Sequence, residues 1–343
     1  MSSPETSRPP GGRRGQGQRG ADLVVIGDCN PDVLVLGEDV TPEFGQQEKL
    51  VESMSLAIGG SAAITAVAAA RLGLNVALVA AVGADPAGDF MLSELARAGV
   101  GTAAVTVRDD APTGMTVALS RGEDRAILTA VGAVASLTAA DVPGALLARV
   151  RHVHLSSYFL VKDSLGPGLA QLLSAARAAG ATTSLDTNWD PAGRWGDERL
   201  QAALAQTDLL LPNKTEALRL AGEEDLGAAA QVLTAGGAKL VIKLGQRGAL
   251  SIDGPRQDHV WLPPVTPVDE TGAGDCFNAG LIAGLLAGLA MPHAVALGCA
   301  AGALSTRAPG GTGSCPDLAT ALALAETATI RRIETERCQH GCA

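Results

Sequence analysis

Basic side chains are in short supply in this sequence. The 343 residues include 26 lysines and arginines against 36 aspartates and glutamates, which gives a formal net charge of −10. Most of such a surface would repel a nucleic acid, so we expect no nucleic-acid partner. A small anionic ligand would need positive potential supplied locally, by helix N-termini, loop amides and a few Lys or Arg side chains.

The sequence also lacks an apolar stretch near its start and a segment long enough to cross a membrane. Residues 1–20 are rich in Ser, Pro, Gly and Arg, and we interpret them as a flexible tail. The uncharged run at residues 279–291 is shorter than the roughly 20 residues that a membrane span requires, and Pro292 interrupts it. We therefore expect a cytoplasmic protein with no membrane partner.

Cysteine is sparse, with six residues spread over a chain long enough to bury a core without disulfides. We interpret them as reduced thiols of a cytosolic protein. Near the C-terminus, Cys338, His340 and Cys342 lack a fixed fourth ligand, which argues against a zinc site there.

The common phosphate-binding motifs are missing as well. No Gly-x-x-x-x-Gly-Lys-Ser/Thr loop occurs, which disfavours a P-loop enzyme. A Gly-x-Gly-x-x-Gly pattern spans residues 15–20, but it precedes the first predicted strand, and no helix follows to hold a pyrophosphate. A dinucleotide-binding oxidoreductase is still the main alternative from another enzyme class, because it too is built from alternating strands and helices.

From Asp22 onward, short β-branched runs alternate with Ala- and Leu-rich helical segments. This alternation predicts an α/β fold with a mostly parallel central sheet flanked by helices, over residues 21–325, followed by a C-terminal tail at 326–343. The predicted strands lie at residues 23–26, 76–80, 153–156, 182–186, 209–211, 239–244 and 249–252. The predicted helices lie at residues 62–72, 87–98, 168–179, 215–220, 226–235, 276–289 and 293–305.

Two stretches interrupt the alternation, at about residues 33–56 and 103–130. Short strands joined by turns are expected there. Strands set apart from the main sheet are typical of a small lid over a site at the carboxyl ends of the parallel strands. Additional strands on one edge of the main sheet are the alternative.

One segment carries the strongest chemical signal, at residues 268–280. Gly272, Ala273 and Gly274 predict a tight turn that opens a helix, so that backbone N–H groups and the helix dipole converge on one anion. Asp275 follows in the first helical turn, where the dipole is expected to favour its ionised form and make it a weak base. A carboxylate beside an anion hole suits phosphoryl transfer, although an ordinary helix cap would explain the turn alone.

Seven motifs in order along residues 22–316 resemble those of the ribokinase-like, or PfkB-type, family of carbohydrate kinases. Residues 269–280 resemble its C-terminal signature and residues 59–73 its N-terminal signature. The other matches lie at residues 82–89, 112–114, 186–188, 212–216 and 243–245. The resemblance implies a ribokinase-like α/β fold with a small β-strand lid, and an enzyme that phosphorylates a hydroxyl of a small sugar or sugar-like molecule, using ATP and Mg²⁺.

The resemblance also implies a role for individual residues. Asp275 matches the catalytic base of the family, and the Gly272–Gly274 turn matches its anion hole. Asp32 is the candidate ligand of acceptor hydroxyls, with capping of an expected turn at Asn30 and Pro31 as the alternative. At the paired glycines Gly59 and Gly60, the lack of a Cβ would let the backbone approach the sugar closely. The implied acceptor-binding residues are Asp32, Gly59, Gly60 and Ser61.

Nucleotide and ion sites are implied in the same way. The matching ATP-binding residues are Asn188, Lys243, Gly245 and Gly248. Asn213 and Glu216 match an element that acts on Mg²⁺ and phosphate largely through water, and a helix cap fits the same pair equally well. Asp269 and Thr271 resemble one side of a monovalent-cation site of some members, which adds K⁺ as an expectation.

The motifs do not select a substrate. Many sugar-specific members have Asn at the position of Ile64, so one acceptor hydroxyl loses its partner here. A nucleoside kinase of the same family and a sugar-binding regulator without catalysis are the alternative functions. Some members form a homodimer through the lid strands, so Phe44 and residues 33–36 are expected either at such an interface or over the substrate.

Overall fold

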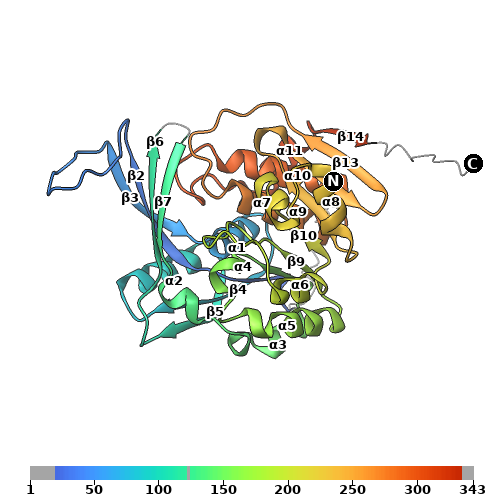
Figure 1. The fold of residues 1–343 in the computed structure, drawn as a ribbon, viewed down its shortest axis with the longest axis horizontal. Coiled ribbons are helices and arrows are strands. Elements are labelled where there is room, and N and C mark those ends of the chain that lie inside the picture. Colours follow the sequence, from blue (N-terminus) through green and yellow to red (C-terminus); the bar gives the residue numbers. More distant parts are fainter. Residues whose placement is uncertain (1–19, 122–123, 334–343) are drawn as a thin grey trace, which may run out of the picture.

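The structure is a computed structural model of the chain, and it describes residues 20–121 and 124–333. A ten-stranded sheet passes through the molecule with helices on both faces, and a separate four-stranded sheet stands beside it (Figure 1). Each strand and helix predicted above overlaps an observed element. The predicted α/β architecture with a mostly parallel central sheet is confirmed.

Seven neighbouring strands of the large sheet are parallel, and three strands at one edge are antiparallel. The central strands are short apolar runs such as Leu-Val-Val-Ile in β1, buried along their whole length, because helices cover both faces. In spatial order the strands are β14 (Thr329–Ile333), β13 (Arg256–Trp261), β12 (Ala249–Asp253), β11 (Lys239–Lys243), β10 (Leu209–Leu210), β9 (Thr182–Leu185), β8 (His152–Leu155), β1 (Leu23–Ile26), β4 (Val76–Gly83) and β5 (Gly101–Arg108).

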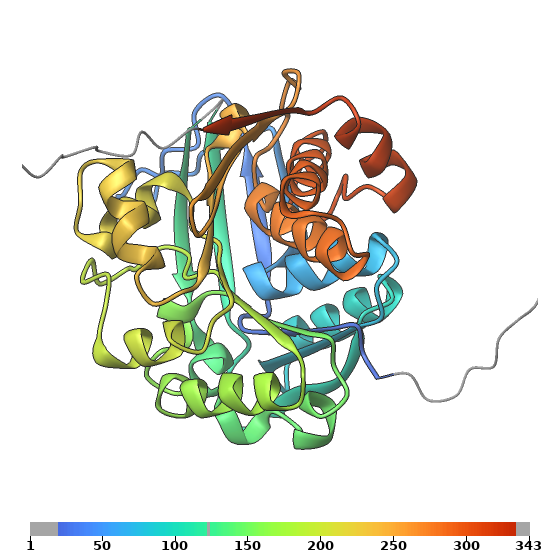
Figure 2. The ribbon, with the colours of Figure 1, turned by 90° about the vertical axis from the view of Figure 1, so that its right-hand side faces the viewer.

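The helices form two layers, one on each face of this sheet (Figure 2). One layer contains α1 (Ser61–Arg71), α2 (Pro86–Arg97), α9 (Ala273–Leu286), α10 (Met291–Ser305) and α11 (Leu318–Ala325). The other contains α3 (Gly144–Leu147), α4 (Tyr158–Val161), α5 (Gly166–Ala178), α6 (Glu198–Leu204), α7 (Lys214–Ala221) and α8 (Leu226–Thr234). The sheet is therefore enclosed on both faces, and ligands must reach it at the strand ends.

Small residues allow α9 and α10 to pack closely. A Cβ added at Gly280 would lie 2.7 Å from the backbone oxygen of Leu297, and one at Gly298 would lie 2.9 Å from that of Phe277. These two helices account for the uncharged run in the sequence. No helix within residues 20–121 and 124–333 is long and apolar enough to cross a membrane.

The four-stranded sheet corresponds to the predicted lid strands, with two differences. Its strands are β3 (Ser53–Gly59), β2 (Asn30–Leu36), β6 (Met115–Arg121) and β7 (Asp124–Ala130), of which β2 and β6 are parallel. The prediction is wrong for residues 103–108, which belong to β5 at the edge of the main sheet. The expected turn at Asn30 and Pro31 is also wrong, because both residues pair in β2. Phe44, in the loop after β2, is 99% exposed.

The C-terminal end of the described chain also differs from its prediction. Residues Thr329–Ile333 pair with β13 as an added antiparallel strand, although they fall in the predicted tail at 326–343. The remaining tail predictions, for residues 1–19 and 334–343, lie outside the described residues, and so do Cys338, His340 and Cys342.

Candidate active site

Polar side chains gather where the parallel strands end. Asp28 lies just beyond β1, Asp186 directly follows β9, and Lys243 is the last residue of β11. The carboxyl ends of parallel strands lie at one edge of a sheet, which is where ligands bind in open α/β folds. Asp28 and Asp186 are buried, and the Lys243 side chain is 13% exposed.

The glycine turn before α9 reaches the same edge. Gly272 has a φ of 71°, in the left-handed region that favours glycine. A Cβ there would lie 2.7 Å from Cα of Gly311 and 3.0 Å from Cγ2 of Ile64, so the turn is tightly packed. A Cβ at Gly274 would lie 3.5 Å from Nζ of Lys243. An anion bound at this turn would therefore meet both the N-terminus of α9 and an ammonium group.

Lys243 lies at the centre of an acidic cluster. Its ammonium group is paired with Asp186, whose Oδ2 also accepts a hydrogen bond from Nδ2 of Asn278 at 2.7 Å. Burial lowers the pKa of Lys243, but the charges of Asp186, Glu216 and Asp275 outweigh burial and leave the pKa above its usual value. Lys243 therefore stays charged and neutralises part of the cluster.

Asp275 is a buried carboxyl with a perturbed pKa. Burial is the main reason that its pKa is raised well above the usual value, and the charges of Asp186 and Asp28 add to it. The Lys243 ammonium group and the Ser61 side chain act in the opposite direction. The prediction of a weak base held ionised by the helix dipole is therefore wrong, because burial and neighbouring carboxylates outweigh the dipole.

The N-terminus of α1 is held beside Asp275. The amides of Ser61 and Ala62 each donate to one carboxylate oxygen of Asp28, at 3.0 Å. The Ser61 side chain accepts a hydrogen bond from Nδ2 of Asn188 and lies close enough to Asp275 to lower the pKa of that carboxyl. One serine thus joins the segment after the paired glycines, the segment after β9 and the first turn of α9.

Asp32 and the paired glycines meet where the two sheets adjoin. Asn30 and Asp32 lie in β2, with Asn30 opposite Gly59 of β3. A Cβ at Gly59 would lie 1.9 Å from Oδ1 of Asp32, and a Cβ at Gly60, where φ is 80°, would lie 2.8 Å from the backbone oxygen of Asp28. The positive φ and the nearby backbone require glycine at position 60, and a side chain at position 59 would displace the carboxylate of Asp32.

Three buried side-chain oxygens of the described residues have no hydrogen-bond partner. They are Oγ1 of Thr187, Oδ1 of Asn188 and Oδ1 of Asn278. Two of these residues directly follow Asp186, and the third donates to it. Unpaired buried polar atoms are costly and often indicate a bound water, ion or ligand. Their position fits a hydrated, polar ligand beside the Lys243–Asp186 pair.

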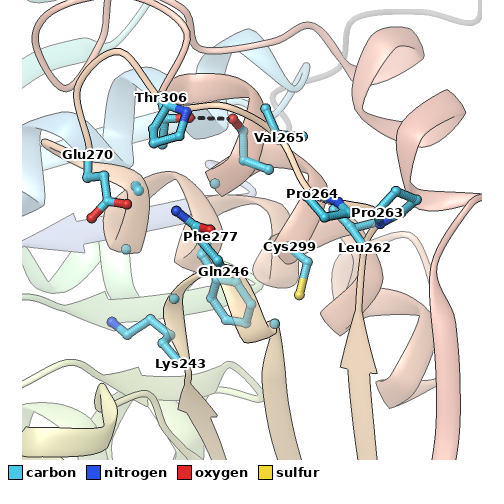
Figure 3. Close-up of a pocket in the computed structure, with 17 residues that line it drawn as sticks. Lys243, Gln246, Leu262, Pro263, Pro264, Val265, Glu270, Phe277, Cys299 and Thr306 are labelled. Carbon is cyan, nitrogen blue, oxygen red and sulfur yellow. Dashed lines mark hydrogen bonds between the residues drawn. The ribbon is translucent and has the colours of Figure 1, made fainter. Parts of the chain in front are cut away.

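A pocket of about 220 Å³ opens beside the first turn of α9 (Figure 3). Lys243 and Glu270 lie on one side of it, and Leu262 and Cys299 lie on the other. The walls are mainly apolar, and the N-terminal residues of α9 close one end. Such a pocket suits a flat, apolar ring whose charged substituent extends toward Lys243.

The four predicted ATP-binding residues are placed in two groups. Lys243, Gly245 and Gly248 line the pocket; Gly245 begins a single 3₁₀ turn after β11, and Gly248 directly follows that turn. Asn188 is not among the lining residues and lies instead beside Ser61.

Asn213 and Glu216 form a reciprocal cap at the start of α7. The amide of Asn213 donates to Glu216 at 2.7 Å, and the amide of Glu216 donates to Oδ1 of Asn213 at 2.9 Å. Burial, followed by the charge of Asp186, raises the pKa of Glu216 to about 7, although Lys243 lowers it. The pair is thus a helix cap, and its carboxyl also belongs to the acidic cluster.

Asp269 connects two loops next to the glycine turn. Its Oδ1 accepts hydrogen bonds from the amide and hydroxyl of Thr271 at 2.9 and 2.7 Å, and its Oδ2 accepts one from the amide of Gly310 at 2.8 Å. Among residues 20–121 and 124–333, no three His, Cys, Asp or Glu side chains are grouped to hold a metal ion.

Comparisons with known proteins agree with this geometry. The profile of the pfkB family carbohydrate kinases matches residues 21–318. The 2-dehydro-3-deoxygluconokinase of Bacillus subtilis is 30% identical over 314 residues, covering 83% of this chain and 92% of that protein. The ribokinase of Haemophilus influenzae is 28% identical, covering 86% and 95%. The structure of Arabidopsis thaliana ribokinase with ribose and ATP superposes with a TM-score of 0.75 at 24% identity, covering 90% and 99%.

The chain belongs to the pfkB family of carbohydrate kinases. It is a carbohydrate kinase with a ribokinase-like fold, as the motifs predicted. The name of each relative gives the substrate of that relative only.

Sequence reasoning did not assign three residues of the cluster. Asp186 lies in a recognised motif, but only Asn188 of that motif was given a role. Asp28 lies two residues beyond the first strand, a position that predicts a site residue in a parallel sheet. Asn278 lies one helical turn after Asp275, on the same side of α9.

Proposed function

We propose that this protein transfers the terminal phosphate of ATP to a hydroxyl of a small sugar or sugar-like molecule, with Asp275 as the catalytic base. One observation carries the proposal. Ser61, next to the paired glycines of the acceptor side, lies close enough to Asp275 to lower its pKa, and Asp275 directly follows the glycine turn. A hydroxyl held near Asp32 would thus lie between a proton acceptor and an anion-binding turn.

The charges around Asp275 fit this role. Its raised pKa makes it a stronger base toward an alcohol than an exposed aspartate would be. Lys243, next to Gly274, and the amides of the Gly272–Gly274 turn would stabilise the negative charge of the phosphoryl group. In a loose transition state the hydroxyl needs orientation first and loses its proton late.

The nucleotide and its metal ion would occupy the adjoining pocket. The apolar walls suit the base of ATP, and we assign Lys243, Gly245 and Gly248, which line the same pocket, to its phosphates. Mg²⁺ would supply charge neutralisation on the phosphates, with Asn213 and Glu216 acting on its hydration shell. K⁺ beside Asp269 and Thr271 is part of the proposal; ADP release should fall when Na⁺ replaces K⁺ in the assay buffer, and an equal rate in both buffers would remove K⁺ from the proposal.

An ADP-release screen tests the function. Purified protein with Mg-ATP is offered sugars, sugar acids and nucleosides, and we expect ADP formation with a sugar-like acceptor. Asp275→Asn should lower kcat by roughly 10² to 10⁴, as loss of a positioned base commonly does, while ATP binding persists. Asp317→Asn is the matched control, because Asp317 caps α11 and Asn caps helices equally well.

The outcomes separate the alternatives. Unchanged turnover by Asp275→Asn would remove this residue from the mechanism. Turnover confined to nucleosides would assign a nucleoside kinase. Saturable sugar binding without ADP formation would identify a regulator.

A further inference from the structure

Aromatic side chains are rare in this chain, yet half of them form one cluster. The sequence contains 3 Trp, 1 Tyr and 4 Phe, and four of these eight lie together as Tyr158, Phe159, Trp195 and Trp189. Successive rings meet edge to face, with centroids 5.4, 5.7 and 4.9 Å apart. Such geometry is favourable for aromatic pairs and fixes their orientation.

Exposure changes abruptly at the end of this row of rings. Tyr158, Phe159 and Trp195 are 0, 6 and 9% exposed, whereas Trp189 is 58% exposed. The loop that carries Trp189 is held by Asp190, which accepts hydrogen bonds from the amides of Ala192, Arg194 and Trp195 at 2.9, 2.7 and 2.8 Å. The exposed indole therefore rests on a buried aromatic support.

The position of Trp189 relates it to the acceptor side of the active site. The four aromatic residues follow β8 and β9, at the carboxyl edge of the sheet where Asp186 and Lys243 lie. Trp189 directly follows Asn188, whose Nδ2 donates to Ser61. Oγ1 of Thr187 and Oδ1 of Asn188, in the same segment, are buried without a partner and are available to a ligand.

We propose that Trp189 determines acceptor specificity by stacking against the ring of the acceptor, so that cyclic acceptors are preferred over open-chain polyols. This inference rests on the proposed function. A furanose or pyranose ring presents C–H groups on one face, and its hydroxyls point outward from the rim. An indole can cover the apolar face while Asp32 and Thr187 bind hydroxyls. An open-chain polyol offers no such face.

Two ring/open-chain pairs test the preference, D-ribose against D-ribitol and D-fructose against D-mannitol. Trp189→Ala should raise KM for the cyclic member by roughly 5- to 100-fold, the range expected when one stacked ring is lost. KM for ATP should stay within twofold, and the advantage of ring over chain should fall toward unity. Trp189→Phe retains a ring and should restore most of the preference, which loss of folding would not allow.

A binding measurement keeps this proposal separate from the kinase proposal. Fluorescence of the native protein without ATP is quenched with acrylamide in the presence of D-ribose, D-fructose or cytidine. We expect at least one of these cyclic compounds to protect an exposed indole, and the protected component to be absent in Trp189→Phe. Absence of protection by all three would overturn the stacking role. An unchanged acceptor KM in Trp189→Ala would also overturn it, while phosphoryl transfer by the native protein would leave the kinase function standing.

Discussion

Glu216 offers the sharpest test of the buried charge cluster. The substitution Glu216→Gln keeps the size of the side chain and an oxygen that can accept from the amide of Asn213, but it removes the titrating charge. Burial, followed by the charge of Asp186, raises the pKa of Glu216 from its usual 4.5 to about 7. An ionised Glu216 therefore destabilises the folded protein relative to a neutral one.

The raised pKa fixes the sign of the effect. A carboxyl with a higher pKa in the folded state binds a proton on folding between pH 4.5 and 7, so it favours folding less as pH rises through this window. The difference between 7 and 4.5, at about 1.36 kcal/mol per pH unit, corresponds to about 3 kcal/mol. We expect Glu216→Gln to exceed the native protein in stability by about that amount at pH 8, and by under about 1 kcal/mol at pH 5.

Thermal and urea unfolding at pH 5 and pH 8 measure this difference. With an unfolding entropy of about 2.1 cal/mol/K per residue over roughly 300 residues, 3 kcal/mol corresponds to a rise in Tm of about 5 °C. Glu198→Gln, in the exposed first turn of α6, is the control and should change stability by less than about 0.5 kcal/mol. A stability difference that is equal at both pH values would refute the reasoning.

Two further predictions concern other parts of the molecule. Gly59→Ala places a methyl group against the carboxylate of Asp32. We therefore expect the KM for the acceptor to rise tenfold or more while the KM for ATP is unchanged. Gly236→Ala is the control and should change neither KM, because a Cβ there meets nothing within 4 Å. Burial lowers the pKa of His154 to about 4, so this histidine destabilises the fold as pH falls below about 6.5. Between pH 7.5 and pH 5, we expect the free energy of unfolding of His154→Gln to fall by about 2 kcal/mol less than that of the native protein, as measured by urea unfolding. An equal fall in both proteins would contradict this prediction.

Local features of the site were predictable from sequence, whereas its electrostatics were not. The glycine turn and the following acid occupy consecutive residues, so their geometry depends on backbone preferences that the sequence states directly. The contacts of Lys243 with Asp186 and Gly274 join the ends of separate strands and a helix. The pKa of Asp275 depends on those contacts and on burial, which explains why its predicted direction was wrong.

The same distinction explains the errors in the fold. Hydrophobic alternation located the strands, but it carries no information about which sheet a strand joins. Residues of β5 resemble lid strands in sequence and nevertheless pair with β4, and β14 extends the sheet edge beyond the predicted domain. Both are edge strands, where one neighbour alone determines pairing and burial patterns are weakest.

The distribution of charge also constrains what the site binds. Asp28, Glu216 and Asp275 all have raised pKa values, and the ammonium group of Lys243 lies within their cluster. A nucleoside triphosphate without a metal ion would add negative charge to a region that already has an excess of it. The turn before α9 offsets this negative charge only near the transferred phosphate, because the field of a helix dipole is strong only at the first turn of the helix. A divalent cation that arrives with the nucleotide would supply the missing positive charge, so we expect the magnesium complex of ATP to be the form that enters this site.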